Sequence, residues 1–149
     1  MGTPFAQVID LSLTIIRDWR LDKLFDEDEE AFVEVMSGYL VKAIPKFAPS
    51  CRKSLAYNFD TKEFEQELDM CEIDILADWT CYMHLQDLHN DVLEMRAALS
   101  SSDFKRIEQA ALLKSRTAYL EYLRRKIKID TNNYQFQFLD SYFGGDADA

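Results

Sequence analysis

Few residues in this sequence could bind a metal ion or act as a nucleophile. The two histidines, His84 and His89, are five residues apart on a predicted helix, so their rings point in different directions. Cys81 and His84 share one helix face, as do Asp87 and Asp91, but zinc needs about four converging ligands and no second Cys/His pair completes a site. The chain also has no Gly-x-Ser-x-Gly element and no glycine-rich phosphate loop. We therefore expect no catalytic residue, no metal and no cofactor, and we expect that the protein is not an enzyme.

Charged side chains gather in two stretches of opposite sign. Asp26–Glu30 places five carboxylates in a row, which suits either a cation site or the first turn of a helix, whose positive dipole end favours acids. We favour the helix start. Between Lys114 and Lys128 the chain carries six basic residues and one acid, Glu121. Three interpretations of this basic stretch are open. Its cations could complement the negative C-terminal end of a helix dipole, pair with the acidic run of the same or a neighbouring molecule, or bind nucleic acid.

The overall charge bears on these alternatives. The net charge is −10 and the pI is about 4.6, whereas a protein that binds the phosphate backbone needs a cationic surface. We therefore favour the dipole and partner interpretations of the basic stretch, and we assign Arg124, Arg125 and Lys128 to partner binding. An acidic surface also suits a protein that must repel phosphate.

The C-terminal segment is rich in aromatic residues. Tyr134, Phe136 and Phe138 alternate with glutamines, and a period of two predicts a strand or an extended arm over residues 131–149. An extended chain of about 20 residues reaches roughly 60 Å, enough to cross a neighbouring subunit. We predict that this arm binds other protein subunits through its apolar side chains; the alternative is that it folds back over its own bundle. The arm residues assigned to partner binding are Tyr134, Phe136, Phe138, Leu139, Tyr142 and Phe143.

These residues must be positioned by helices, since only four glycines and three prolines interrupt the chain. The dipeptide Thr3-Pro4, an N-cap followed by proline at the first helical position, predicts a helix over residues 4–17. Apolar residues at 19–25 form a connection. A second helix is predicted over 28–44, and it ends before Pro45.

The second half of the chain holds the clearest helical patterns. Residues 45–68 are less regular and predict a small β-hairpin or an extended loop. Asp69 and Glu72 have the spacing of a capping box, and the apolar pattern behind them predicts a helix over 70–99. Another helix is predicted over 103–128. A short Ser-rich break between two long helices predicts an antiparallel pair.

Together these patterns predict an all-α fold. We expect a bundle of about four helices with a long antiparallel helix pair, a small irregular or β-hairpin segment and an extended C-terminal arm. Residues 1–130 form the bundle domain and residues 131–149 the arm. No apolar run approaches the ~18 residues that a membrane helix needs. The three cysteines are an odd number without a framework spacing, which indicates reduced thiols in a cytoplasmic chain.

Three stretches of the chain, in their order and spacing, resemble the small α-helical neck proteins of tailed bacteriophages, which are the head–tail connector or adaptor subunits below the portal. The stretches are FVEVMSGYLVKAIPKFAPSCRKSL, FEQELDMCEIDILADWTCYMHLQDL and SSSDFKRIEQAALLKSRTAYLEYLRRKI. The residues that carry the likeness are Ala43–Phe47 before Cys51, Glu72 before Ile75–Ala77, Asp103–Lys105, Leu113, Lys114 and Tyr119. The likeness covers roughly residues 30–130 and consists of helix-packing patterns, without a catalytic signature.

The resemblance implies a structural virion protein with no active site. It implies a homo-oligomeric ring of about a dozen copies that joins the portal protein to the tail or to other neck proteins. Genomic DNA would pass through the ring during packaging and ejection without specific binding. The protein would be found in the neck of the virion, and in the host cytoplasm during assembly.

Two other classes of function remain open from the sequence. A small acidic helical module could inhibit or regulate a host nucleic-acid-binding protein by occupying its basic site. A bundle enzyme could use Cys81, His84 and the nearby acids. Bound zinc or iron at one ion per chain would favour the enzyme, and a stable monomer or dimer bound to a basic host protein would favour the regulator.

Overall fold

The protein folds into a group of helices with a small hairpin on one side. The computed structural model describes residues 2–16, 19–98 and 103–144, with side chains over 2–16, 23–88, 90 and 114–139. Within these ranges the α helices are α1 (Phe5–Leu13), α2 (Trp19–Glu27), α3 (Glu29–Phe47), α4 (Met70–Ala98) and α5 (Asp103–Gly144). A 3₁₀ turn (Ala48–Ser50) follows α3, and strands β1 (Tyr57–Asn58) and β2 (Glu63–Phe64) form the hairpin. The predicted all-α fold with a small β-hairpin is confirmed.

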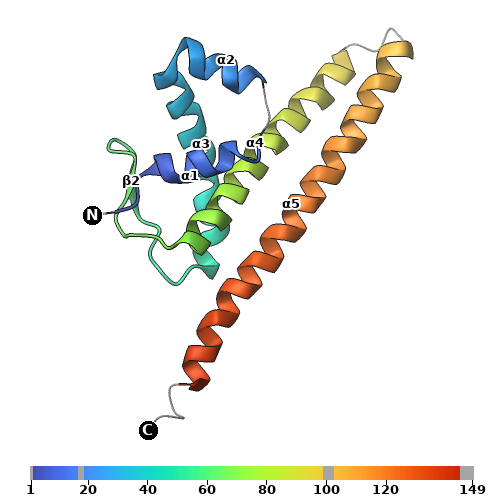
Figure 1. Ribbon diagram of the computed structural model, residues 1–149. Helices are drawn as coiled ribbons and strands as arrows, with labels where there is room; N and C mark the ends of the chain where they lie inside the picture. The colour runs from blue at the N-terminus through green and yellow to red at the C-terminus, as the bar shows by residue number, and fades with distance from the viewer. Residues whose placement is uncertain (1, 17–18, 99–102, 145–149) are drawn as a thin grey trace.

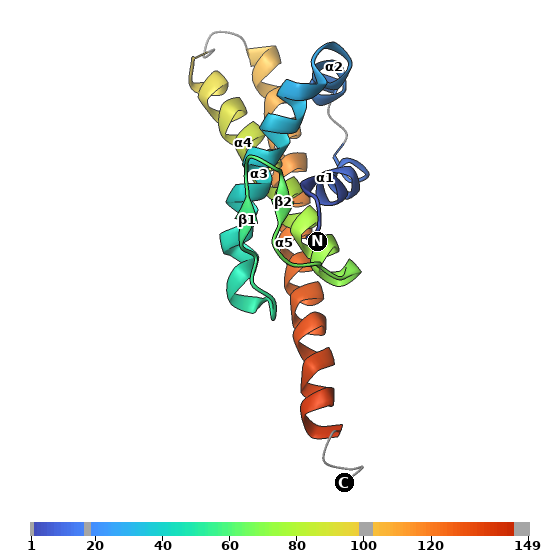
Figure 2. The same cartoon turned by 90° about the vertical axis from the view of Figure 1, so that its left-hand side faces the viewer.

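Helix α4 lies at the centre of the arrangement. It packs against α1, α3 and α5, and α2 packs against α3. Figure 1 shows α4 and α5 as a long antiparallel pair, with α1, α2 and the hairpin on the other side of α4. Figure 2, turned by 90°, shows the hairpin and α3 in front of α5 and the C-terminal end of α5 extending beyond the rest of the fold. The predicted antiparallel pair is confirmed.

The core forms where apolar stripes of four helices meet. In α3 the buried side chains of Phe32, Met36, Leu40 and Ala43 recur at three- and four-residue steps, which places them on one helix face. Burying a side chain such as Phe or Leu contributes about 1.5–3 kcal/mol. Side chains that other elements add to the same core include Phe5, Val8, Ile9, Phe64, Ile75, Leu76, Cys81, Leu123 and Tyr134. None of the described helices is both long and apolar enough to cross a bilayer.

The hairpin fastens the N-terminal segment to the body. Tyr57 pairs with Phe64 and Asn58 with Glu63. The Asn58 side-chain oxygen accepts hydrogen bonds from the backbone of residues 60 and 61 at 2.9 and 3.3 Å, which closes the turn. The backbone N–H of Phe64 donates to the carbonyl of Thr3 at 2.8 Å. The N-terminal segment thus pairs with the hairpin and brings α1 against α4.

Two predicted helix starts are confirmed in atomic detail. The backbone N–H of Asp69 donates to Glu72 Oε1 at 2.9 Å, and the N–H of Glu72 donates to Asp69 Oδ1 at 2.9 Å, so the capping box is complete. Asp28 caps α3 by accepting from the N–H of Ala31 at 3.1 Å, with Glu29 and Glu30 in the first turn. The end of the acidic run therefore begins a helix, as predicted.

The first helix is shorter than predicted. Helix α1 covers Phe5–Leu13 instead of 4–17, and Pro4 occupies the extended N-cap position. Thr3 does not cap the helix, because its hydroxyl accepts a hydrogen bond from the backbone N–H of Leu68 at 2.8 Å. The segment predicted to be a connection forms α2. Helix α3 continues past Pro45, since a proline in the last turn removes only one hydrogen bond.

The extended arm predicted for 131–149 is wrong over residues 131–144, which continue α5. The alternating aromatics gave a period of two, but Tyr134 and Phe138 are also four residues apart and share one helix face. The polar stretch at 130–133 has no glycine or proline to end the helix. Residues 145–149 lie outside the described residues.

Candidate functional site

The C-terminal aromatic residues divide between the inside and the outside of the molecule. Tyr134 is 2% exposed, and its ring packs against Phe47 and Phe138 with centroid distances of 5.6 and 4.9 Å. Phe136 and Leu139 are exposed, at 61% and 46%. The structure therefore assigns Tyr134 to the core of its own chain instead of a partner surface. The side chains of Tyr142 and Phe143 lie outside the described residues.

A buried carboxylate connects α5 to the start of α4. The Tyr134 hydroxyl donates to Glu72 Oε2 at 2.8 Å, and the Cys51 thiol donates to the same oxygen at 3.3 Å. Lys53 Nζ lies 3.1 Å from Glu72 Oε1, which also accepts the capping hydrogen bond from Asp69. Burial raises the pKa of Glu72, but these four donors outweigh it and leave the pKa below its ordinary value. Glu72 is therefore held as a carboxylate inside the fold.

The loop after α3 completes this attachment. The backbone N–H of Arg52 donates to the Tyr134 hydroxyl at 3.0 Å, and the Arg52 guanidinium lies 3.7 Å from the centroid of the Phe138 ring. Burial raises the pKa of the Cys51 thiol to about 11, so it is protonated and acts as a hydrogen-bond donor. This cluster is structural, and it fixes the C-terminal part of α5 on the body.

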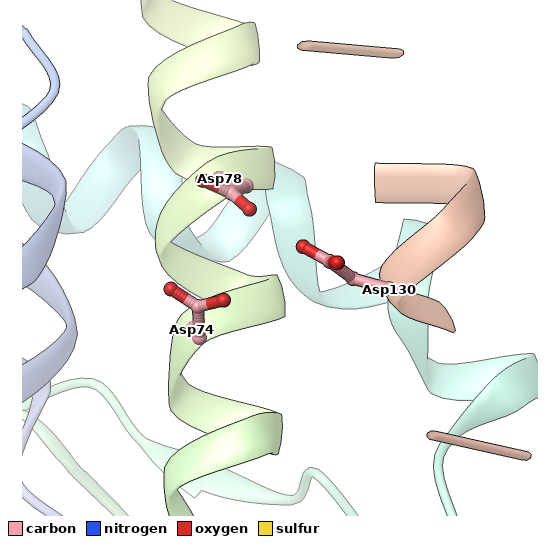
Figure 3. A group of neighbouring side chains, drawn as sticks. All are labelled: Asp74, Asp78 and Asp130. Carbon is pink, nitrogen blue, oxygen red and sulfur yellow. The ribbon is translucent and has the colours of Figure 1, made fainter. Parts of the chain in front are cut away.

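A second polar cluster joins the middle of α4 to α5. Figure 3 shows Asp74 and Asp78 on α4 and Asp130 on α5, on facing helices. One carboxylate oxygen from each lies within 4.8 Å of the others, an arrangement that could hold a cation. The Lys126 ammonium already serves as that cation, at 2.6 Å from Asp78, 3.1 Å from Asp130 and 3.8 Å from Asp74.

Burial and hydrogen bonding act in opposite directions on the pKa values of this second cluster. Burial raises the pKa of Asp78, and the hydrogen bond from Lys126 opposes that rise. Burial lowers the pKa of Lys126, but its hydrogen bonds to Asp78 and Asp130 outweigh this and raise the pKa above the ordinary value. Sequence reasoning missed this group. The available signal was the spacing of four between Asp74 and Asp78 on one predicted helix, with Lys126 on the predicted neighbouring helix. Asp130 lies beyond the end predicted for that neighbouring helix, residue 128.

Cys81 and His84, which were considered as metal ligands from the sequence, lie inside the fold and do not belong to the acidic group around Lys126. Cys81 is buried, and burial raises the pKa of its thiol to about 12. The His84 ring packs edge-on against Tyr39 at a centroid distance of 5.0 Å, and the Tyr39 hydroxyl donates to Asp87 Oδ2 at 3.0 Å. The side chain of Asp91 lies outside the described residues. Among the described side chains, the acidic group around Lys126 is the one that brings three potential ligands together.

The side of α5 that faces away from α4 carries apolar residues at regular spacing. Tyr122, Ile129 and Phe136 are seven residues apart, so they follow one another along one face, and they are 56%, 58% and 61% exposed. Arg125 and Lys128 are exposed beside them. We refer to Tyr122, Arg125, Lys128, Ile129, Phe136 and Leu139 as the outer face of α5. The ion pairs found between described side chains do not involve Arg125, Lys128 or the neighbouring Arg124.

A cavity of about 780 Å³ lies between α1, α2, α3 and the hairpin. Its apolar lining consists of Phe5, Ile9, Leu13, Phe25, Phe32 and Val33. Its carboxylates are Asp10, Asp26, Glu29 and Glu63, all on exposed residues. We call this cavity the acidic pocket. The one lysine in its lining, Lys62, is paired with Glu34 at 3.0 Å. The pocket therefore combines an apolar lining with an excess of negative charge.

Sequence reasoning placed the acidic run and the basic stretch on the chain but missed the pocket, which exists only where three helices and a hairpin meet. Comparison with known proteins adds no further information on the site. No family model, no curated protein and no solved structure matches this chain.

Proposed function

We propose that this protein is a structural subunit of the neck of a tailed phage virion, which joins the portal to the tail and keeps a DNA channel open. The observation that carries the proposal is the outer face of α5, an exposed apolar and basic stripe on a helix that extends beyond the body of the fold. Exposed apolar residues at heptad spacing are typical of a surface that packs against protein. The helix-packing motifs that resemble neck proteins agree with this role.

The charge of the chain supports a channel through which DNA passes. With a net charge of −10, the subunit repels the phosphate backbone overall and offers few sites for counterion release. Such a ring would let DNA slide without specific binding. The proposal includes assembly in the host cytoplasm and a final position in the virion neck, in contact with the portal and with tail or other neck proteins.

Negative-stain imaging tests the proposal. The purified chain is mixed with the portal and tail proteins encoded beside it, and we expect a ring of added density on the portal. A variant with Ile129→Asp and Phe136→Asp, both at exposed positions, should remain folded by circular dichroism and lose that density. If the wild-type chain binds neither portal nor tail, the proposed function is wrong.

The acidic pocket supports a second candidate function. A cavity with an apolar lining and four carboxylates suits a basic, partly apolar segment of another protein. The chain would then inhibit or regulate a host nucleic-acid-binding protein. Affinity capture from host lysate, followed by competition with duplex DNA, tests this function. Capture of a basic host protein that DNA can displace would support the regulatory function. If no such protein is captured and the chain binds the portal, the neck function is supported.

A further inference from the structure

We propose that the acidic pocket of one subunit binds the outer face of α5 of a second copy of this chain. The contact would place Tyr122, Ile129 or Phe136 against the apolar lining and the basic side chains Arg125 and Lys128 against the carboxylates. This inference deepens the proposed function, because it specifies the contact by which copies of the subunit would join.

The two surfaces match in chemistry. The outer face combines large apolar side chains with two cations, and the pocket combines an apolar lining with Asp10, Asp26, Glu29 and Glu63. Because Lys62 is already paired with Glu34, the carboxylates around the pocket keep an excess of negative charge. Opposite charges at the edge of an apolar contact steer association and fix its register.

The two surfaces also match in size. The pocket volume of about 780 Å³ lies within the range of roughly 300–1,000 Å³ that is usual for cavities that bind ligand-sized groups. Residues four apart on a helix are about 6 Å apart along the axis. Arg125 and Ile129 therefore lie one turn from each other, close enough for the carboxylates and the apolar lining of one pocket to contact both at once.

One chain cannot make this contact with itself. Figures 1 and 2 show α1, α2 and the hairpin on one side of α4, and α5 on the opposite side. Because α1 and α3, which line the pocket, pack on α4 and α5 packs on its opposite side, the outer face must reach the pocket of another molecule. Two different patches that bind each other form a heterologous, head-to-tail contact, which closes into a ring or continues as a filament.

Charge complementarity favours a second copy over nucleic acid as the occupant of the outer face. DNA would meet the cations of α5 but would be repelled by the net charge of the chain. A second copy supplies both the cations and the carboxylates that accept them. The contact should therefore be favoured at low salt and weakened when salt screens exposed charges.

Two full-length variants test the two surfaces of the contact one at a time. The pocket variant carries Asp26→Lys and Glu29→Lys, and the face variant carries Arg125→Glu and Lys128→Glu; all four positions are exposed. A control variant with Glu65→Lys and Glu67→Lys has the same change in net charge as the pocket variant, at exposed positions outside the pocket lining. Self-association of each protein is measured by sedimentation velocity over a concentration series at low and high salt.

We expect the wild type and the control to self-associate at low salt, and each of the two test variants to do so roughly tenfold to a hundredfold more weakly. The decisive result is the mixture of the two test variants. The pocket variant retains an intact outer face and the face variant an intact pocket, and their two reversed surfaces also carry opposite charges, so the mixture should associate head to tail more strongly than either variant alone. Combining all four substitutions in one chain reverses both charges and should restore self-association.

A wild-type chain that stays monomeric throughout, or a mixture that associates no more strongly than either variant alone, would overturn the proposal. Failure of the proposed contact can be distinguished from failure of the proposed neck function. If rings form on the portal with the pocket and face variants as they do with the wild type, the contact is wrong and the neck function stands. If the chain associates head to tail but does not bind portal or tail, the contact stands and the neck function is wrong.

Discussion

Replacing Lys126 with methionine removes the ammonium that three carboxylates share, and it should destabilise the fold strongly. Asp78 is 0% exposed, and Lys126 Nζ lies 2.6 Å from its Oδ2. Removing one partner of a fully buried ion pair costs about 3–5 kcal/mol. Because the Lys126 side chain is 35% exposed, solvent screens part of this interaction, so we expect a loss of roughly 2–3 kcal/mol in the free energy of unfolding at neutral pH.

The loss should depend on pH in a defined direction. Burial already raises the pKa of Asp78, and losing Lys126 removes the group that opposes the rise. The folded variant then binds protons more tightly than its unfolded chain, so its stability falls as pH rises through the carboxylate range. The difference from wild type should be largest near pH 7 and should shrink toward about pH 4.

Urea unfolding followed by far-UV circular dichroism measures both effects. Lys128→Met is the matched control, because Lys128 is exposed on the same helix and has no place in the cluster. Calcium should bind the three freed carboxylates of the Lys126→Met variant, and at a concentration of 100 Kd it would restore about 2.7 kcal/mol. Equal stability of the two variants at pH 7, or a deficit that does not change with pH, would refute this account.

Three further predictions concern the hydrogen-bonded cluster, the N-terminal segment and the thiols. Tyr134→Phe removes a donor from the buried Glu72 carboxylate and should lower the free energy of unfolding by about 1–3 kcal/mol in urea titrations, whereas an unchanged value would show that the cluster adds no stability. Gly2→Ala places a methyl group against the backbone of β2, so hydrogen exchange at the hairpin should accelerate; unchanged protection would contradict this packing. At pH 8, iodoacetamide should modify the exposed Cys71 well before Cys51, whose pKa is raised to about 11, as followed by peptide mass spectrometry. Equal rates would mean that the Cys51 thiol is not held in its hydrogen bond.

The starts of α3 and α4 could be predicted from the sequence because their signals are local. Asp69 and Glu72 lie within a few residues of the backbone groups they satisfy, and their spacing identified the start of α4. The start of α3 was indicated by the acidic run, which contains the cap, Asp28. The long apolar repeat behind Glu72 gave the extent of α4 to within one residue for the same reason. Such patterns do not depend on which other elements lie nearby.

The parts that sequence reasoning missed depend on contacts between elements. Tyr134 and Phe138 fit a strand or a helix equally well, and what makes them helical is packing against Phe47 and hydrogen bonding with Glu72. The acidic pocket needs three helices and a hairpin in their final positions. The pairing of Lys126 with Asp74 and Asp78 depends on how far α5 is shifted along α4. The apolar pattern of either helix alone does not give that register.

The two roles of Glu72 have a consequence for how the molecule opens. The Glu72 carboxylate accepts a hydrogen bond from the backbone N–H of Asp69 at the start of α4. It also accepts one from the hydroxyl of Tyr134, which lies 62 positions later in the chain. If Tyr134 moves away from Glu72, the Glu72 side chain loses a hydrogen bond that holds it in its capping position. If the first turn of α4 unfolds, the Tyr134 hydroxyl loses the Glu72 carboxylate as its acceptor. Amide exchange at the N-terminal end of α4 and along the distal part of α5 should therefore rise and fall together, as one cooperative unit.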